Sequence, residues 1–292
     1  MSMRSPLAQY ITVTLSYWAF TLTDGALRML VLLFFHNLGY SPIEIASLFL
    51  LYEFFGVVTN LYGGWLGSRF GLTLTMQLGL GLQIFALALL LADPSVLTVV
   101  YVMIAQAISG IAKDLNKMAA KSSIKTLVAD GEQGKLYRWV AMLTGSKNAL
   151  KGMGYFLGGA LLATVGFQGS IAALLSLLLV ALVMGSWLLE YQPGSNKGSF
   201  SQSLSPSAGV NRLSAARLFL FCARDVWFVV ALPVFLQSQL GWSPVQVGSL
   251  MAAWVIIYGA IQAIAPKITG SHVPSGRTLY VWDTLLTLLP CG

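Results

Sequence analysis

The sequence predicts an all-α membrane protein built from two helical halves. Hydrophobic residues make up 57% of the 292 residues and charged residues only 9%, whereas an average soluble domain has roughly 25% charged residues. The mean hydropathy is +0.76. Apolar stretches of about 20 residues, long enough to cross a hydrocarbon layer of about 30 Å, recur along the chain. Together with a short internal repeat, these observations indicate a bundle of transmembrane helices.

The apolar stretches define the predicted helices. Eight of them span residues 10–35, 43–66, 73–91, 96–118, 138–165, 169–189, 214–237 and 244–265, and a ninth begins near Leu279. The first stretch contains Asp24 and lacks a convincing small-residue cleavage site, so we interpret it as an uncleaved first helix and not as a signal peptide.

The connections between these helices alternate in charge. HNLGYSP, ADPS, GFQG and SQLGWSP contain no Lys or Arg, whereas the opposite connections contain Arg4, Arg69, Lys121, Lys125, Lys135, Arg138, Lys197, Arg212, Lys267 and Arg277. Cytoplasmic loops of membrane proteins carry the excess of positive charge. We therefore expect a multi-pass protein of the inner (plasma) membrane with a cytoplasmic N-terminus, and we assign the net charge of +7 to topology rather than to a nucleic-acid partner.

An internal repeat relates the two predicted halves. LGYSPIEIASL at 38–48 matches LGWSPVQVGSL at 240–250 at an offset of 202, with six identities in eleven positions. Six predicted helices, an even number, separate the copies, so the halves have the same orientation. Parallel halves with a substrate site between them are typical of transporters.

The repeat also predicts the domain organisation. We expect an N-terminal six-helix half at 1–190, a cytoplasmic linker rich in Ser, Gly and Pro at 191–213, and an incomplete C-terminal half at 214–292. At the same offset, Gly292 corresponds to position 90, the end of the third helix. We therefore expect a bundle truncated after about nine of twelve helices.

Two short motifs resemble those of the major facilitator superfamily. GGWLGSRFGL at 63–72 resembles the GxLADRxGRR loop between the second and third helices, with Ser68 in place of the usual Asp. GYFLGG at 154–159 resembles the GPxxGG of the antiporters of this superfamily, with Tyr155 in place of Pro. The resemblance implies a major facilitator-type two-half bundle that works by alternating access.

Longer stretches are similar to the ArsJ-type organoarsenical efflux permeases of that superfamily. They are YWAFTLTDGALRMLVLLFFHNLGYSP, LYEFFGVVTNLYGGWLG, SGIAKDLNKMAAKSSIK and LYRWVAMLTGSKNALKGMGYFLGG. This resemblance implies export of 1-arseno-3-phosphoglycerate and resistance to arsenate. It also implies glyceraldehyde-3-phosphate dehydrogenase as the functional partner, because that enzyme makes the arsenical when it uses arsenate instead of phosphate.

Ten ionisable residues fall inside the predicted helices or at their edges. They are Asp24, Arg28, Glu53, Lys113, Asp114, Lys117, Lys147, Lys151, Arg224 and Asp225. A charge at the centre of a membrane helix costs about 2.5 to 3.5 kcal/mol on insertion scales, so we expect these side chains to face a wet cavity or one another. Six are basic and four are acidic, and a bound anion would neutralise the excess positive charge.

The spacing of these residues suggests their roles. Lys113 and Lys117 lie one helical turn apart, as do Lys147 and Lys151. We assign seven residues to substrate binding: Arg28, Lys113, Lys117, Lys147, Asn148, Lys151 and Arg224. We assign four acids to coupling or ion pairing: Asp24, Glu53, Asp114 and Asp225.

Purely structural readings of the same residues stay open. Lys113 and Lys117 can pair with Asp114 or Glu53, and Arg28 can pair with Asp24 on its own helix. Lys121 and Lys125 fit a topological role better than a functional one.

Other function classes lack a pattern in this sequence. HExxH, GxSxG and paired His are absent, so we predict no enzyme activity and no cofactor. Cys222 and Cys291 are too few and too far apart for a disulfide framework or a thiolate metal site, and their scarcity suits a pentavalent oxyanion better than a thiophilic arsenic species. The expected partners are a small anionic substrate and the lipid bilayer. The alternatives are another organic-anion or organophosphate antiporter, or an inactive truncated fragment.

Overall fold

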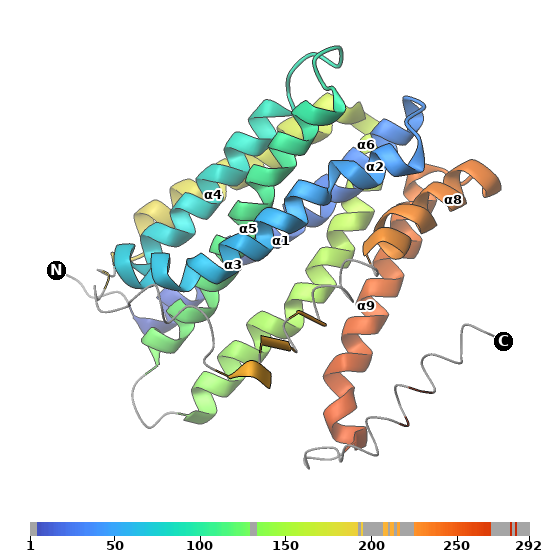
Figure 1. Ribbon diagram of the computed structural model, residues 1–292. Coiled ribbons are helices and arrows are strands. Elements are labelled where there is room, and N and C mark those ends of the chain that lie inside the picture. Colours follow the sequence, from blue (N-terminus) through green and yellow to red (C-terminus); the bar gives the residue numbers. More distant parts are fainter. Residues whose placement is uncertain are drawn as a thin grey trace.

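The computed structural model describes residues 5–128, 133–191, 194, 207–209, 211–212, 215–216, 225–269, 281 and 284. These residues form a helical bundle without strands (Figure 1). The helices are α1 (Pro6–Asn37), α2 (Pro42–Leu48), α3 (Leu50–Phe70), α4 (Leu72–Leu89), α5 (Val99–Leu127), α6 (Gln133–Leu188), the π-helical η2 (Asp225–Ala231), α8 (Leu232–Leu240) and α9 (Pro244–Thr269). The predicted all-α class is confirmed.

Helix α6 consists of two helices that meet at Gly166. This residue has φ 69° and ψ −177°, a positive φ that glycine adopts readily and other residues avoid. The two parts run in opposite directions through the bundle (Figure 1). The break falls in GFQG, where the sequence predicted a loop between the segments 138–165 and 169–189.

Several helices are suited to a membrane. Five stretches are long and apolar enough to span one: Pro6–Asn37, Pro42–Asn60, Leu72–Leu89, Gly145–Leu188 and Pro244–Ile261. The fourth of these includes the reversal at Gly166, so it has the length of two crossings. Helix α5, with 29 residues, is also long enough to span a membrane, but Lys113, Asp114 and Lys117 interrupt its apolar sequence. Large apolar side chains such as Trp187 and Trp254 are exposed on the outside of the bundle, where lipid would cover them.

The internal repeat encodes the same helix start twice. In the first copy, the Ser41 N–H donates to the Glu44 carboxylate over 2.8 Å, and the Ser41 side chain accepts from the Glu44 N–H. In the second copy, the Ser243 N–H donates to Gln246 Oε1 over 2.8 Å, and Ser243 Oγ accepts from the Gln246 N–H over 3.3 Å. Both are capping boxes, which satisfy backbone donors at a helix start. The matched sequences therefore begin α2 and α9 by the same chemistry.

Glycines let the helices around the charged residues approach closely. A Cβ added to Gly25 of α1 would lie 2.7 Å from the carbonyl oxygen of Lys151 of α6. A Cβ added to Gly110 of α5 would overlap the carbonyl oxygen of Tyr52 of α3. Small residues of this kind allow membrane helices to pack backbone to backbone. The backbones of Tyr52 and Lys151 are thereby fixed against neighbouring helices.

Helix α9 packs along the first part of α6 (Figure 1). A Cβ added to Gly248 would lie 2.8 Å from the carbonyl oxygen of Tyr155, and one added to Gly152 would lie 2.9 Å from that of Ala252. With η2 and α8, α9 is the described part of the predicted C-terminal half. The predicted boundaries at 1–190, 191–213 and 214–292 stay a prediction. Most of the linker and the predicted ninth helix lie outside the described residues.

We predict that Gly110→Ala destabilises the protein by about 1 to 3 kcal/mol, because an extra methyl group in a filled contact forces the backbones apart. Gly81→Ala on α4 is the matched control, since a Cβ there meets no atom within 4 Å and alanine favours a helix by up to about 1 kcal/mol. The check is the Tm of each purified variant in detergent. Equal Tm values for the two variants would contradict the proposed close contact.

The expected orientation can be tested at the two ends of α5. In a variant with Cys222 and Cys291 replaced by Ser, we expect Ser95→Cys, in the loop before α5, to react with an impermeant thiol reagent added outside intact cells. Thr126→Cys, an exposed position at the other end of α5, should react only after the membrane is opened. The reverse labelling pattern would show that the N-terminus is outside.

Candidate functional site

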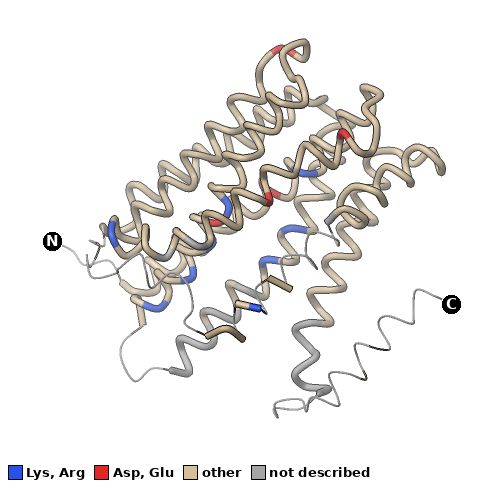
Figure 2. Tube along the Cα trace, viewed as in Figure 1, with Lys and Arg blue, Asp and Glu red and all other residues tan. Residues whose placement is uncertain are grey.

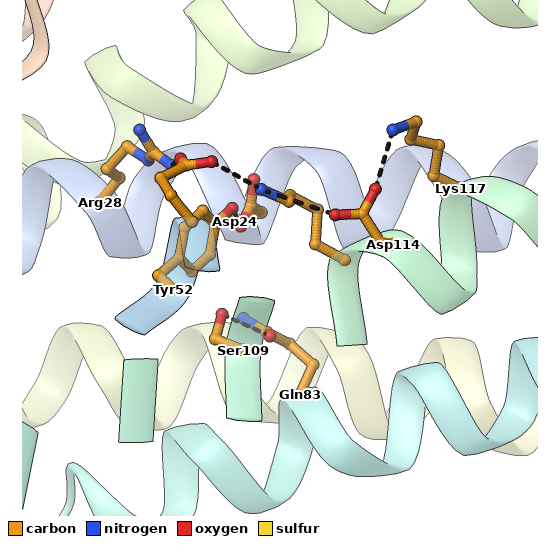
Figure 3. A network of polar contacts seen from close by, with 9 residues as sticks. Asp24, Arg28, Tyr52, Gln83, Ser109, Asp114 and Lys117 are labelled. Atoms are coloured by element: carbon orange, nitrogen blue, oxygen red, sulfur yellow. Dashed lines mark hydrogen bonds and ion pairs between the residues drawn. The ribbon is translucent and has the colours of Figure 1, made fainter. Parts of the chain in front are cut away.

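Charged side chains from three helices form one network inside the bundle. Figure 3 shows Asp24, Arg28 and Tyr52 gathered at one end of this network and Asp114 joined to Lys117 at the other. The network also includes Glu53 and Lys113. Its members come from α1, α3 and α5, which places most of the acids and bases predicted from the sequence in contact with one another.

Glu53 is shared by two cations. Its Oε1 accepts from Arg28 Nη2 over 2.5 Å, and its Oε2 lies 3.5 Å from Lys113 Nζ. Arg28 is 4% exposed, whereas Glu53 is 32% exposed. A guanidinium withdrawn from water needs a charged acceptor, and Glu53 supplies it from a different helix.

Asp114 links the network to the next turn of α5. Its Oδ1 lies 2.8 Å from Lys117 Nζ, and its Oδ2 lies 3.9 Å from Lys113 Nζ. A Cβ added to Gly56 of α3 would lie 2.8 Å from Asp114 Oδ2. Gly56 therefore leaves the space that the carboxylate occupies between α3 and α5.

Tyr52 connects Asp24 to the cations. Its hydroxyl donates to Asp24 Oδ1 over 2.5 Å. Its ring centroid lies 4.6 Å from Arg28 Cζ and 4.0 Å from Lys113 Nζ, within the range of cation–π attraction. Arg28 therefore pairs across helices with Glu53, and Asp24, one turn away on α1, is held by Tyr52 instead of by Arg28.

Lys147 and Lys151 on α6 differ from the other amines. Both are half-buried, and neither has a carboxylate within ion-pair distance among the described residues. Helix α6 contains no Asp or Glu, and the coloured stretch of its first part in Figure 2 shows blue but no red among the tan residues. Lys151 Nζ lies 5.7 Å from the Tyr155 ring centroid.

The charges of these two amines interact with charges of the network. The charges of Lys151, Lys117, Lys113 and Lys121 all repel that of Lys147. The charge of Lys151 in turn attracts that of Glu53. The described part of the site therefore combines five basic side chains, from Arg28 to Lys151, with the three acids Asp24, Glu53 and Asp114, and the two α6 lysines carry its excess positive charge.

Comparison with known proteins identifies the family. The sequence pattern of the Major Facilitator Superfamily matches residues 11–292. The chain belongs to the Major Facilitator Superfamily. Membership makes it a membrane transporter by fold and agrees with the apolar helices of a multi-pass protein. No curated protein matches the chain.

Solved structures similar to this major facilitator include peptide transporters. One comes from work on substrate recognition in proton dependent oligopeptide transporters. It has a TM-score of 0.65 and 16% identity, and the match covers 93% of this chain and 71% of that transporter. A POT family transporter in complex with a thioalcohol-conjugated peptide has a TM-score of 0.63 and 12% identity, and the match covers 91% of this chain and 71% of that transporter. A peptide transporter mutant in complex with alafosfalin has a TM-score of 0.58 and 15% identity, and the match covers 91% of this chain and 69% of that transporter. At such identities the likeness shows the fold alone.

The chain is shorter than the transporters that it resembles. It spans between 51% and 71% of the length of the similar structures.

Three predicted site residues are not among the described contacts of the network. Arg224 lies outside the described residues, and Asp225 begins η2 without a described side chain. The substrate-binding role assigned to Arg224 and the coupling or ion-pair role assigned to Asp225 stay predictions. Asn148 lies at the contact between α6 and α9, where a Cβ added to Gly259 would be 2.9 Å from Asn148 Cβ.

Sequence reasoning missed the uncharged members of the site. Tyr52 is buried beside Glu53 on α3, and its place next to an intramembrane acid was the available signal. Behind it, the buried Ser109 of α5 donates to Gln83 Oε1 of α4 over 2.7 Å (Figure 3). No cluster of His, Cys, Asp and Glu suited to a metal ion occurs in the described part of the chain.

We predict that Tyr52→Phe destabilises the protein by about 1.5 to 3 kcal/mol, the range for a hydrogen bond to a charged group. The ring contacts with Arg28 and Lys113 would survive, so the loss would report the hydroxyl alone. Asp24→Asn together with Tyr52→Phe should cost less than the sum of the single changes, because the two groups interact. Tm measurements test this, with Tyr40→Phe as the control. Strict additivity would show that the bond contributes nothing.

Proposed function

We propose that this major facilitator exports a small organic anion with several negative charges, and that Lys147 and Lys151 bind its oxyanion groups. The observation that supports the proposal is the lack of an acidic partner for either amine among the described residues. Two half-buried ammonium groups on an apolar helix are unfavourable without compensation. An incoming anion supplies that compensation and binds by charge-assisted hydrogen bonds.

The neighbouring ion pairs give the anion further contacts. Lys113 lies 3.5 Å from Glu53 and 3.9 Å from Asp114, longer than the 2.8 Å between Lys117 and Asp114. Of these two amines, Lys113 is therefore the one that can more easily leave its carboxylates and bind a substrate. Arg28 presents a planar guanidinium suited to oxyanions. In this scheme Glu53 and Asp114 act as counter-ions that the substrate displaces during alternating access, and Asp24, held by Tyr52, stays a candidate for coupling.

Within this class, we propose 1-arseno-3-phosphoglycerate as the substrate. Its arsenate and phosphate groups carry negative charge at both ends, which suits paired amines one helical turn apart. The similarity of four long stretches to the ArsJ-type permeases supports this choice. The proposal includes a glyceraldehyde-3-phosphate dehydrogenase as the source of the arsenical, the inner membrane as the location and no enzyme activity in the transporter itself.

A different organophosphate or organic anion is the second candidate, since it would use the same amines. A neutral or zwitterionic peptide, the kind of substrate named for the similar solved structures, fits less well. A zwitterion needs a balanced set of acids and bases, whereas the described site has two more bases than acids.

Uptake into everted membrane vesicles tests the proposal. The vesicles receive arsenate, glyceraldehyde-3-phosphate, NAD and purified glyceraldehyde-3-phosphate dehydrogenase, and arsenic inside them is measured by mass spectrometry. We expect uptake only when all four components are present. Uptake of labelled 3-phosphoglycerate without arsenic uptake would favour the second candidate. No uptake of either would favour an inactive chain.

We predict that Lys147→Ala and Lys151→Ala each lower uptake at least about tenfold, because a charge-assisted hydrogen bond contributes about 1.5 to 3 kcal/mol. Lys125→Ala, at an exposed position of α5, should leave uptake unchanged. Membrane levels of each variant are measured by immunoblot. Normal uptake by both α6 variants would remove these lysines from the substrate site.

A further inference from the structure

A second group of amines lies beside the network, toward the end of the bundle that contains the N-terminus. Lys113, Lys117, Lys121 and Lys125 recur at every fourth residue of α5, so they follow one side of the helix. Lys117 and Lys121 continue this line beyond the acids, and their charges repel that of Lys147 on α6, the helix whose Leu143 packs in one cluster with Ala120 and Ile124 of α5. The topological role expected for Lys121 from the sequence does not account for this arrangement.

Lys121 and Lys125 occupy different environments although both are basic and close to the helix end. Lys121 is half-buried, whereas Lys125 is exposed. The charge of Lys121 meets repulsion from Lys117 and from Lys147. No carboxylate among the described residues lies within ion-pair distance of Lys121. A lysine that only sets the membrane topology would be better solvated with its amine in water, where the exposed Lys125 lies.

The packing around this position keeps the amines together. Ala120 and Ile124 of α5 belong to a buried cluster with Tyr10 of α1 and Leu143 of α6. Tyr10 also stacks on Trp139 of α6 with ring centroids 4.3 Å apart. The three helices are therefore held against one another at this level, so the backbones that carry the amines cannot separate to relieve the repulsion.

We infer that Lys121, with Lys117 and Lys147, forms a capture site for the oxyanion group of a soluble substrate at this end of the bundle. The inference rests on the proposed function and adds a step that precedes binding at Lys151, Lys113 and Arg28. The deeper amines lie among three acids, whereas in the described part of the chain the group around Lys121 has a single ion pair with an acid, that of Lys117 with Asp114. An approaching anion therefore meets the least compensated positive charge first.

Affinity labelling with pyridoxal 5′-phosphate tests the site without transport. This anionic aldehyde forms an imine with a lysine amine and releases water, and borohydride then fixes it as a secondary amine that mass spectrometry locates. We expect the purified protein to be labelled more at Lys121 than at the more exposed Lys125, and 3-phosphoglycerate to suppress the labelling at Lys121 but not at Lys125. After denaturation both should react equally.

Two labelling outcomes would overturn the inference. One is labelling that follows exposure, with Lys125 modified at least as much as Lys121. The other is protection of Lys121 by phosphatidylglycerol in nanodiscs but not by 3-phosphoglycerate, which would assign the amine to lipid headgroups. In neutral-lipid nanodiscs the protection by 3-phosphoglycerate should persist.

Transport kinetics provide the second test. In the vesicle assay, Lys121→Gln should raise KM about fivefold with little change in kcat, because a partly exposed charge assists capture more than translocation. Added salt should raise the KM of the wild type more than that of this variant. Lys125→Gln should match the wild type in both respects. Kinetics of Lys121→Gln equal to those of Lys125→Gln would overturn the capture step while leaving the proposed function intact. A wild type that moves no anion would instead refute the proposed function, and the labelling result would still decide whether Lys121 binds one.

Discussion

The charged network depends on Glu53, because this carboxylate compensates two cations from two other helices. Arg28 is almost completely buried, and a buried guanidinium without a partner is strongly destabilising. The same carboxylate faces Lys113, which also lies between Asp114 and the ring of Tyr52. Removing Glu53 would take a counter-charge away from cations on α1 and α5 at once. The position of α3 between α1 and α5 is therefore an electrostatic requirement as well as a packing one.

Glycines make this network geometrically feasible. Gly110 allows the backbone of α5 to reach that of α3 beside Tyr52, and Gly56 leaves room for the Asp114 carboxylate. Larger residues at these positions would separate the helices and lengthen the ion pairs. Charge attraction weakens with distance and with the entry of water. The burial of charge in this bundle therefore depends on the close packing of small residues.

The sequence was sufficient for the helices but not for the partners of the charged residues. Hydrophobic length located most of the helices, and the reversal at Gly166 fell in a predicted loop, because both depend on local composition. The repeat pointed to equivalent helices, and the capping boxes at Ser41 and Ser243 explain its conserved pattern. Arg28 and Asp24 lie one turn apart, yet each has its partner on α3. Such choices depend on how helices cross, which local spacing does not contain, and Tyr52 was missed for the same reason.

The position of α6 suggests how movement of the halves would reach the site. Lys151 lies on the turn of α6 whose backbone touches Gly25 of α1, and the adjacent Gly152 touches the backbone of Ala252 in α9. One turn of α6 is thus in contact with the N-terminal helices on one side and with the described part of the C-terminal half on the other. Because the contact at Gly25 holds Lys151 beside α1, a change in the angle between α6 and α9 would move α9 relative to Lys151 and the network. Because Lys151 has no carboxylate of its own within ion-pair distance in the described part of the chain, an anion could bind it at this boundary between the two halves without breaking an ion pair.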